Sequence, residues 1–280
     1  DGNNQICYKS YERHKAQVRQ KALDKLVELK KYTKEPFKFA ISGSGALGLC
    51  EQGELPFVQE VFASATGVSK LYPETDCAIE LGGEDAKILF FQGSVEQRMN
   101  STCAGGTGAF IDQMSTLLNM SLEEMNEASL NYHRLYPIAS RCGVFAKTDI
   151  QPLINQGVDK CDLCASIFQA VVDQTITSLA QGRKIEGNIL FLGGPLYFMS
   201  GLRKRFVETL KLSDVQVNCP ETAINFVALG TAICADQEYT YDELYKALED
   251  LVHAPAKLTE SKPLFESEED YQKFIERHKS

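Results

Sequence analysis

Apolar residues along this chain recur in two patterns, one at helical spacing and one in short continuous runs. The helical spacing predicts helices at residues 13–32, 58–66, 110–118, 162–183, 196–210, 221–236, 241–252 and 268–277. The short runs, bounded by turn-forming residues, predict strands at residues 5–11, 37–41, 76–81, 86–91, 95–99, 189–192 and 215–217. Because strands alternate with helices and hairpins are mixed in, the pattern predicts an α/β fold with a mixed sheet in each of two lobes.

Glycine-containing turns follow or interrupt the predicted strands at Ser42–Gly45, Gly82–Asp85, Gly105–Gly108 and Gly193–Pro195. Glycine at a strand end is more often only a tight turn, because glycine adopts left-handed conformations easily. Four such turns in separate structural units favour a cleft whose glycine hairpins surround the phosphates and adenosine of a nucleotide. The sequence has no P-loop, and we interpret Gly43-Ser44-Gly45 as only a fragment of the dinucleotide fingerprint, which argues against a Rossmann dehydrogenase.

A cysteine directly precedes the third turn, within Asn100-Ser101-Thr102-Cys103-Ala104-Gly105-Gly106-Thr107-Gly108-Ala109-Phe110. The positive end of the following helix suits phosphate and also biases Cys103 toward the thiolate form, which favours metal ligation or redox chemistry. Another cysteine, Cys142, lies in Ser140-Arg141-Cys142-Gly143-Val144-Phe145-Ala146-Lys147-Thr148-Asp149. The two motifs suggest a nucleotide and an iron–sulfur cluster in one protein.

Charge and composition narrow the class of protein. The 280 residues carry a net charge of −9, which argues against a general nucleic-acid binder. No apolar run reaches the length of a membrane span and the start does not look like a signal peptide, so we expect a cytoplasmic protein without a membrane partner. The nine cysteines are expected to be thiols or ligands rather than disulfides, and Cys161 and Cys164 to be incidental thiols.

An ordered series of motifs then points to a family: Ile79-Glu80-Leu81-Gly82-Gly83-Glu84-Asp85-Ala86-Lys87, Met99 to Gly108, Arg141 to Ala146, Leu192-Gly193-Gly194 and Ala228-Leu229-Gly230-Thr231-Ala232. The series closely resembles the activators (activases) of 2-hydroxyacyl-CoA dehydratases and their relatives in benzoyl-CoA reductase, the BadF/BadG/BcrA/BcrD type. The resemblance covers about residues 2–235, and the two cysteine motifs are its most specific part.

The resemblance implies a two-lobed actin/hexokinase/Hsp70-like ATPase fold with ribonuclease H-like lobes. It implies lobe I at residues 1–74 and 226–252, lobe II with the cluster motifs at 75–225, and a linker or tail at 253–280. The tail resembles the linker that leads into a second activase-like domain in long multidomain members.

The resemblance also implies the cofactors and partners. Members look like homodimers that bind ATP or ADP with Mg²⁺ and share one [4Fe–4S] cluster, whose ligands here match Cys103 and Cys142. Such a dimer receives an electron from a ferredoxin- or flavodoxin-type donor and passes it to a 2-hydroxyacyl-CoA dehydratase-like partner.

The resemblance also implies roles for individual residues of the site. Gly82 and Gly83 match the second phosphate loop, with Asp85 and Lys87 beside it. Gly105, Gly106 and Thr107 are expected near phosphate, and Gly193, Gly194 and Pro195 match the adenosine loop. Glu80 and Asp85 are the candidate catalytic carboxylates.

The sequence departs from the family pattern at two places. Glu80 stands where the family usually has aspartate, which alters the reach of a carboxylate near Mg²⁺ or its water shell. The family's first phosphate hairpin, of the type Asp-x-Gly-Ser-Thr-Thr, has no match, so we expect it to precede Asp1 and expect lobe I to be truncated with poor ATPase activity.

Two other functions remain open at this point. A small-molecule kinase of the same fold would need a substrate pocket with a catalytic aspartate and would give Cys103 and Cys142 no role. A non-catalytic nucleotide-binding regulatory domain of a larger reductase would bind nucleotide weakly or not at all. The enzyme assignment is therefore open between an ATPase-coupled activator and a module without ATPase activity.

Overall fold

A computed structural model of the chain describes residues 5–33, 35–100, 105–139, 143–255 and 263–279. Its centre is a five-stranded mixed sheet in the order β4-β3-β2-β5-β6. The strands are β2 (Cys77–Leu81), β3 (Ala86–Phe90), β4 (Glu96–Met99), β5 (Ile189–Leu192) and β6 (Val217–Asn218). Strands β2, β3 and β4 form an antiparallel meander, whereas β5 runs parallel to both β2 and β6. The mixed sheet predicted from the sequence is confirmed.

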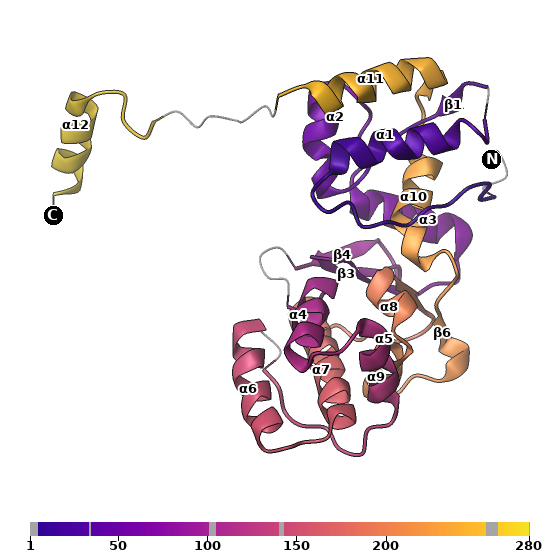
Figure 1. Ribbon diagram of the computed structural model, residues 1–280, viewed down its shortest axis with the longest axis vertical. Coiled ribbons are helices and arrows are strands. Elements are labelled where there is room, and N and C mark those ends of the chain that lie inside the picture. The colour runs from indigo at the N-terminus through magenta and orange to yellow at the C-terminus, as the bar shows by residue number, and fades with distance from the viewer. Residues whose placement is uncertain (1–4, 34, 101–104, 140–142, 256–262, 280) are drawn as a thin grey trace.

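Helices cover both faces of this sheet, which explains why all residues of β2, β3 and β5 are buried. Figure 1 shows the larger helical layer on one face. It consists of α4 (Gly108–Leu118), α5 (Leu122–Leu130), α6 (Gly143–Asn155), α7 (Lys160–Thr175) and α9 (Ser200–Leu210). The opposite face packs against α3 (Glu60–Leu71) and α10 (Phe226–Cys234).

Side-chain alternation along β2 and β3 decides which residues meet each layer. Ile79 and Ile88 point into the larger helical core, and Ala78 and Leu89 point toward α3 and α10. Glu80 and Lys87 therefore also face α3, because side chains two apart on a strand share a face. The antiparallel register places Glu80 directly opposite Lys87, so one cross-strand pair of opposite charges lies under α3.

A smaller helical group lies beyond α3 and α10 (Figure 1). It contains α1 (Val18–Leu29), α2 (Leu47–Gly53), α11 (Tyr241–His253) and the antiparallel pair of β1 (Phe37–Lys38) with β7 (Glu238–Tyr239). Its own apolar core includes Leu23, Leu49 and Leu248. Helix α12 (Glu268–His278) stands apart from both groups in Figure 1. The predicted lobe boundaries stay a prediction, because α3 and α10 lie between the two groups and pack on the large sheet.

Several sequence predictions are wrong in detail. Residues 5–11 form no strand, and the structure pairs this segment with no sheet. The helix predicted at 196–210 is divided at Met199 into α8 (Gly194–Phe198) and α9, and residues 214–216 form a 3-10 turn before β6. The helix predicted at 221–236 is a 3-10 turn, Ala223–Asn225, followed by α10. Helices α2 and α6 were not predicted, since α2 is short and glycine-containing and α6 carries Pro152.

Helix α7 continues through a π-helical turn, Ile176–Ala180, into the longest apolar helix of the described residues. By length and composition alone, Lys160–Ala180 could cross a membrane. Its most apolar window is 67% buried inside the protein, and Phe168 and Val171 belong to the main core. Its apolar length therefore matches its place as the central core helix.

Candidate functional site

Three of the four glycine turns meet at the edge of the large sheet where β2 and β5 end. The N–H of Gly108 donates to the carbonyl of Gly82 at 2.9 Å, and that of Ala109 donates to Gly83 at 2.7 Å. A Cβ atom at Gly108 would also lie 3.3 Å from Cγ of Pro195. The Gly82 turn, the start of α4 and the Gly193 turn are thus neighbours.

The first turn joins this group through α3. A Cβ atom at Gly43 would lie 3.5 Å from Oε1 of Glu60, the first residue of α3. Gly48 extends Gly43 and Gly45 to the full G-x-G-x-x-G spacing, which corrects their interpretation as a fragment. The setting is still not a Rossmann unit, because β1 pairs antiparallel with β7 and the fingerprint requires a parallel βαβ unit.

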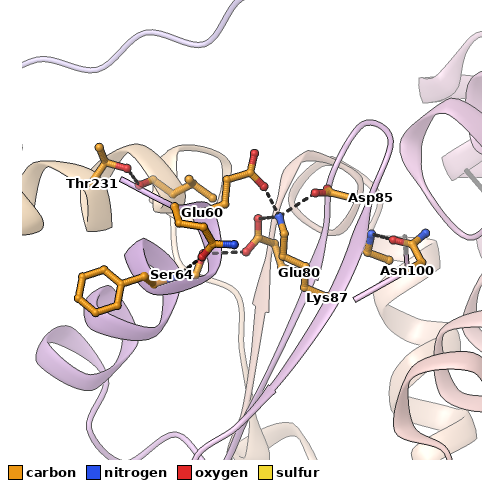
Figure 2. Close-up of polar contacts among 11 residues, drawn as sticks. Glu60, Ser64, Glu80, Asp85, Lys87, Asn100 and Thr231 are labelled. Carbon is orange, nitrogen blue, oxygen red and sulfur yellow. Dashed lines mark hydrogen bonds and ion pairs between the residues drawn. The ribbon is translucent and has the colours of Figure 1, made fainter. Parts of the chain in front are cut away.

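Lys87 lies at the centre of a cluster of carboxylates under α3, which Figure 2 shows in close-up. Its Nζ is 2.7 Å from Oε2 of Glu60, 3.0 Å from Oδ2 of Asp85 and 3.3 Å from Oε1 of Glu80. The Ser64 hydroxyl donates to the second oxygen of Glu80 at 2.9 Å. The expected residues Glu80, Asp85 and Lys87 are therefore brought together, and Glu60 and Ser64 join them from the facing helix.

Burial and charge act in opposite directions on this cluster. Burial raises the pKa of the Glu80 carboxyl, and the charge of Lys87 and the Ser64 hydroxyl oppose that shift. Burial lowers the pKa of the Lys87 ammonium, but Glu80, Asp85 and Glu60 outweigh it and raise that pKa above its ordinary value. Lys87 therefore keeps its proton at neutral pH and holds the carboxylates together.

Sequence reasoning missed Glu60 and Ser64, which lie outside all of the motifs. The one signal in the sequence was their spacing, since residues four apart share a helix face. That face meets the sheet only because α3 packs across β2 and β3, which the sequence pattern did not show.

Glu80 does not fit the expected position near Mg²⁺. One of its oxygens accepts from Ser64 and the other pairs with Lys87, and the residue is only 4% exposed. A Mg²⁺ ion needs free oxygen ligands in octahedral arrangement. No group of three or more His, Cys, Asp or Glu side chains suited to a metal occurs among the described residues. Glu80 is thus placed to hold Lys87 rather than a cation.

Four buried side-chain atoms in the described ranges have no hydrogen-bond partner: Ser42 Oγ, Gln174 Oε1, Thr222 Oγ1 and Asn225 Oδ1. Ser42 begins the first glycine turn, and the Cγ atom of Gln174 lies 3.1 Å from a Cβ position at Gly106. Thr222 and Asn225 flank Ala223, whose carbonyl accepts the N–H of Gly193 at 3.0 Å. Because buried polar atoms normally have a partner, their position beside the glycine turns indicates a polar ligand or water there.

The segment before α1 lies along the same edge. The Tyr11 hydroxyl would be 2.9 Å from a Cβ atom at Gly194, so this glycine lets Tyr11 lie against the turn Gly193–Pro195. Asn225 Nδ2 donates to the Ser10 carbonyl at 3.1 Å, and Arg13 pairs with Asp112 of α4 at 3.1 Å.

Comparison with known proteins decides the family. Residues 6–235 match the BadF/BadG/BcrA/BcrD ATPase family, which is most of the chain. The chain belongs to the BadF/BadG/BcrA/BcrD ATPase family. It is 28% identical over 220 residues to the activator of lactoyl-CoA dehydratase from Anaerotignum propionicum, covering 77% of this chain and 82% of the relative.

Two solved structures share the fold of this chain. The (R)-2-hydroxyglutaryl-CoA dehydratase component A of Acidaminococcus fermentans is 26% identical, with a TM-score of 0.63 over 76% of this chain and 77% of that one. The 2-hydroxyisocaproyl-CoA dehydratase activator of Clostridium difficile with bound ADPNP is 24% identical, with a TM-score of 0.66 over 91% and 89%. The expected actin/Hsp70-like ATPase fold is confirmed.

The two cysteines that make the family motifs specific, Cys103 and Cys142, lie outside the described residues. The residues that follow each of them are described and lie close together. A Cβ atom at Gly143, where α6 begins, would be 3.2 Å from Oε1 of Gln113 and 3.7 Å from Cδ2 of Phe110 on α4. The family's two cysteine motifs therefore each lead into one of two neighbouring helices.

Cys161 and Cys164 contrast with that arrangement. Cys164 is buried in the core beside Met120, and burial raises the pKa of its thiol to about 12. Burial also raises the pKa of the Cys161 thiol. Metal ligation and thiol exchange both need the thiolate, so the environment of this pair disfavours either role.

Proposed function

We propose that this protein is an ATP-dependent activator that passes a low-potential electron from a [4Fe–4S] cluster to an (R)-2-hydroxyacyl-CoA dehydratase or a related reductase. The observation that carries the nucleotide part is the set of unpartnered buried polar atoms beside the glycine turns. The relatives named as dehydratase activators, and the bound ADPNP in one of them, support the same assignment.

Backbone N–H groups and glycines supply the phosphate contacts in this proposal. Gly82 and Gly83 carry no side chain, which lets phosphate oxygens come close to their backbone, and the buried turn Gly105–Thr107 leads into α4 beside them. Helix α4 starts at Gly108 beside this loop. The N–H groups of Gly108 and Ala109 already donate to Gly82 and Gly83, so α4 acts on a phosphate through its dipole rather than through these two groups. The turn Gly193–Pro195 with Thr222 and Asn225 then lies on the nucleoside side. Lys87 neutralises the carboxylates beside the phosphates.

The cluster part rests on donor chemistry. Four thiolates are the usual ligands of such a cluster, so two cysteines per chain require two copies of the chain. Cys103 and Cys142 are the proposed ligands, and the cluster supplies one-electron transfer when bound. The first residues after Gly143 support a partner surface here, because Val144 and Phe145 are large apolar side chains exposed by 70% and 64%. The proposal gives Mg²⁺ no role, since both oxygens of Glu80 are engaged and cannot bind the ion.

The order of residues along the chain offers a direct connection between the nucleotide and the cluster. Helix α4 has its glycine turn at the proposed phosphates, and Cys103 precedes that turn. A shift of the turn on hydrolysis would therefore move the backbone next to the cluster ligand.

The deciding experiment reconstitutes the protein without oxygen and measures iron, sulfide and mass. The proposal expects about two irons and two sulfides per chain in a dimer, which is one shared four-iron cluster. ATP, and not ADP, should then allow the reduced protein to reduce a purified 2-hydroxyacyl-CoA dehydratase. A monomer without iron that still binds ATP would overturn the electron-transfer part and leave a kinase or a regulatory domain.

A further inference from the structure

We infer that Glu60 is a catalytic residue for nucleotide hydrolysis at this site, where its Oε1 atom accepts a hydrogen bond from the attacking water. The inference rests on the proposed function, because it needs a nucleoside triphosphate in the cleft. No motif of the sequence contains Glu60, and only the packing of α3 on the sheet brings it to the glycine turns.

The carboxylate of Glu60 has one fixed oxygen and one free oxygen. Oε2 pairs with Lys87 at 2.7 Å, and Oε1 makes no hydrogen bond within the described part of the chain. In Figure 2 the second oxygen of Glu60 points away from Lys87 and from the rest of the cluster. A carboxylate held in this way keeps its orientation while one lone-pair face remains open to a small molecule such as water.

The other two carboxylates on Lys87 are placed differently. Both oxygens of Glu80 are engaged, and its side chain is 6% exposed. Asp85 is oriented by Lys87 through Oδ2, and its Oδ1 lies over Gly82, only 2.3 Å from a Cβ position there. The Glu60 side chain is 23% exposed and that of Asp85 is 28% exposed. Asp85 Oδ1 is turned back onto its own hairpin at Gly82, whereas the free oxygen of Glu60 points out of the cluster.

Glu60 also lies between the Gly43 turn and the Gly82 turn, and the Gly82 turn is proposed to hold phosphate. Its Oε1 is 3.5 Å from the Cβ position of Gly43, and its partner Lys87 contacts Asp85 of the Gly82 turn. A carboxylate at that place repels phosphate oxygens, which have no proton to give, but it accepts readily from water. Its position therefore suits the water rather than the phosphate.

The step balances without a further reactant. The water oxygen forms a bond to the terminal phosphorus, and the bond from that phosphorus to the bridging oxygen breaks. The bridging oxygen leaves on the nucleoside diphosphate with the electron pair of that bond. One water proton moves to Glu60 Oε1 and is then released to the inorganic phosphate or to solvent.

Glu60→Gln tests the role with little change in size. The amide cannot take the proton, so kcat for ATP hydrolysis should fall by about 10²-fold or more. The Kd values for ADP and for a non-hydrolysable ATP analogue should stay within about twofold of the unmodified protein, because catalysis and not binding is removed. Glu60→Asp, which keeps a carboxylate at this place, should recover part of the rate.

Glu123→Gln is the matched control, since Glu123 is an exposed carboxylate in the first turn of α5. A Glu60→Gln protein that hydrolyses ATP at the unmodified rate would overturn the inference and leave the proposed function standing. A parallel fall in kcat, nucleotide affinity and melting temperature, with no recovery of rate in Glu60→Asp, would also overturn it, because it would show a purely structural ion pair. If the unmodified protein binds no nucleotide, the proposed function fails and the inference fails with it.

Discussion

The backbone of Gly193 passes so close to Leu81 that a Cβ atom at position 193 would lie 2.0 Å from the Leu81 carbonyl oxygen. These residues stand at the ends of the parallel neighbours β5 and β2. The close approach, together with a φ of +88° at Gly193, lets the chain turn from β5 directly into α8. The turn Gly193–Pro195 thus owes its place to one residue without a side chain.

Gly193→Ala should therefore destabilise the protein, by about 2 kcal/mol or more, because the methyl group meets backbone rather than a movable side chain. Thermal or urea unfolding would measure the loss. Gly83→Ala is the control, since a Cβ there has nothing within 4 Å, and its stability should hardly change. Equal stability of the two variants would contradict the close approach.

Lys87→Met should cost about 3–5 kcal/mol of unfolding free energy, since it leaves the buried Glu80 carboxylate without its cation. The double variant with Glu80→Gln should recover part of the loss, because the uncompensated charge is then gone. Urea denaturation of both proteins measures this coupling. Lys273→Met removes an ion pair exposed on both sides and should change stability little. No recovery in the double variant would show that Lys87 stabilises through other contacts.

Asp162 should make stability depend on acid pH. The backbone N–H groups of Arg134 and His133 donate to its carboxylate and hold its pKa below the usual value. A carboxyl whose folded-state pKa is depressed stabilises above its unfolded pKa of about 3.9, and this contribution is lost as the pH falls through the folded value. Asp162→Asn should thus be less stable than the unmodified protein near pH 7, with the difference shrinking below about pH 4. Unfolding curves across this range would show it, and a difference independent of pH would refute it.

Cys103→Ser and Cys142→Ser should each abolish the bound iron while leaving the circular dichroism spectrum and nucleotide affinity unchanged. The reason is that a symmetric dimer of either variant supplies only two thiolates, one from each chain, whereas the cluster needs four. Iron analysis after anaerobic reconstitution provides the measurement. Cys161→Ser is the control and should keep full iron, because burial raises the pKa of that thiol. Full iron in either motif variant would remove that cysteine from the proposed ligand set.

Much of the large sheet could be predicted from the sequence. The apolar runs at residues 76–81, 86–91 and 189–192 became β2, β3 and β5, because a short run of buried residues between turns has few alternatives to a central strand. The sequence also predicts a strand at residues 5–11, but none forms, since a strand exists only where a neighbour pairs with it. Strand pairing depends on tertiary structure, so the residues of one segment cannot predict it.

The site divides in the same way. Its glycine turns could be found from the sequence pattern, and Glu80, Asp85 and Lys87 could be named because their motif resembles that of the family. Glu60 could not, because it is 20 residues from Glu80 and reaches Lys87 only through the packing of α3.

The sequence by itself determined the α/β class, the glycine turns and the cross-strand neighbours within one hairpin, since local periodicity and turn chemistry act over a few residues. Only the tertiary structure decided that Glu60 meets Lys87, that Glu80 is fully engaged and that the turns converge on one edge. Those contacts depend on how the helices pack on a twisted sheet. Burial of apolar surface drives this packing, and because it is non-directional, the local sequence pattern does not specify which side chains meet.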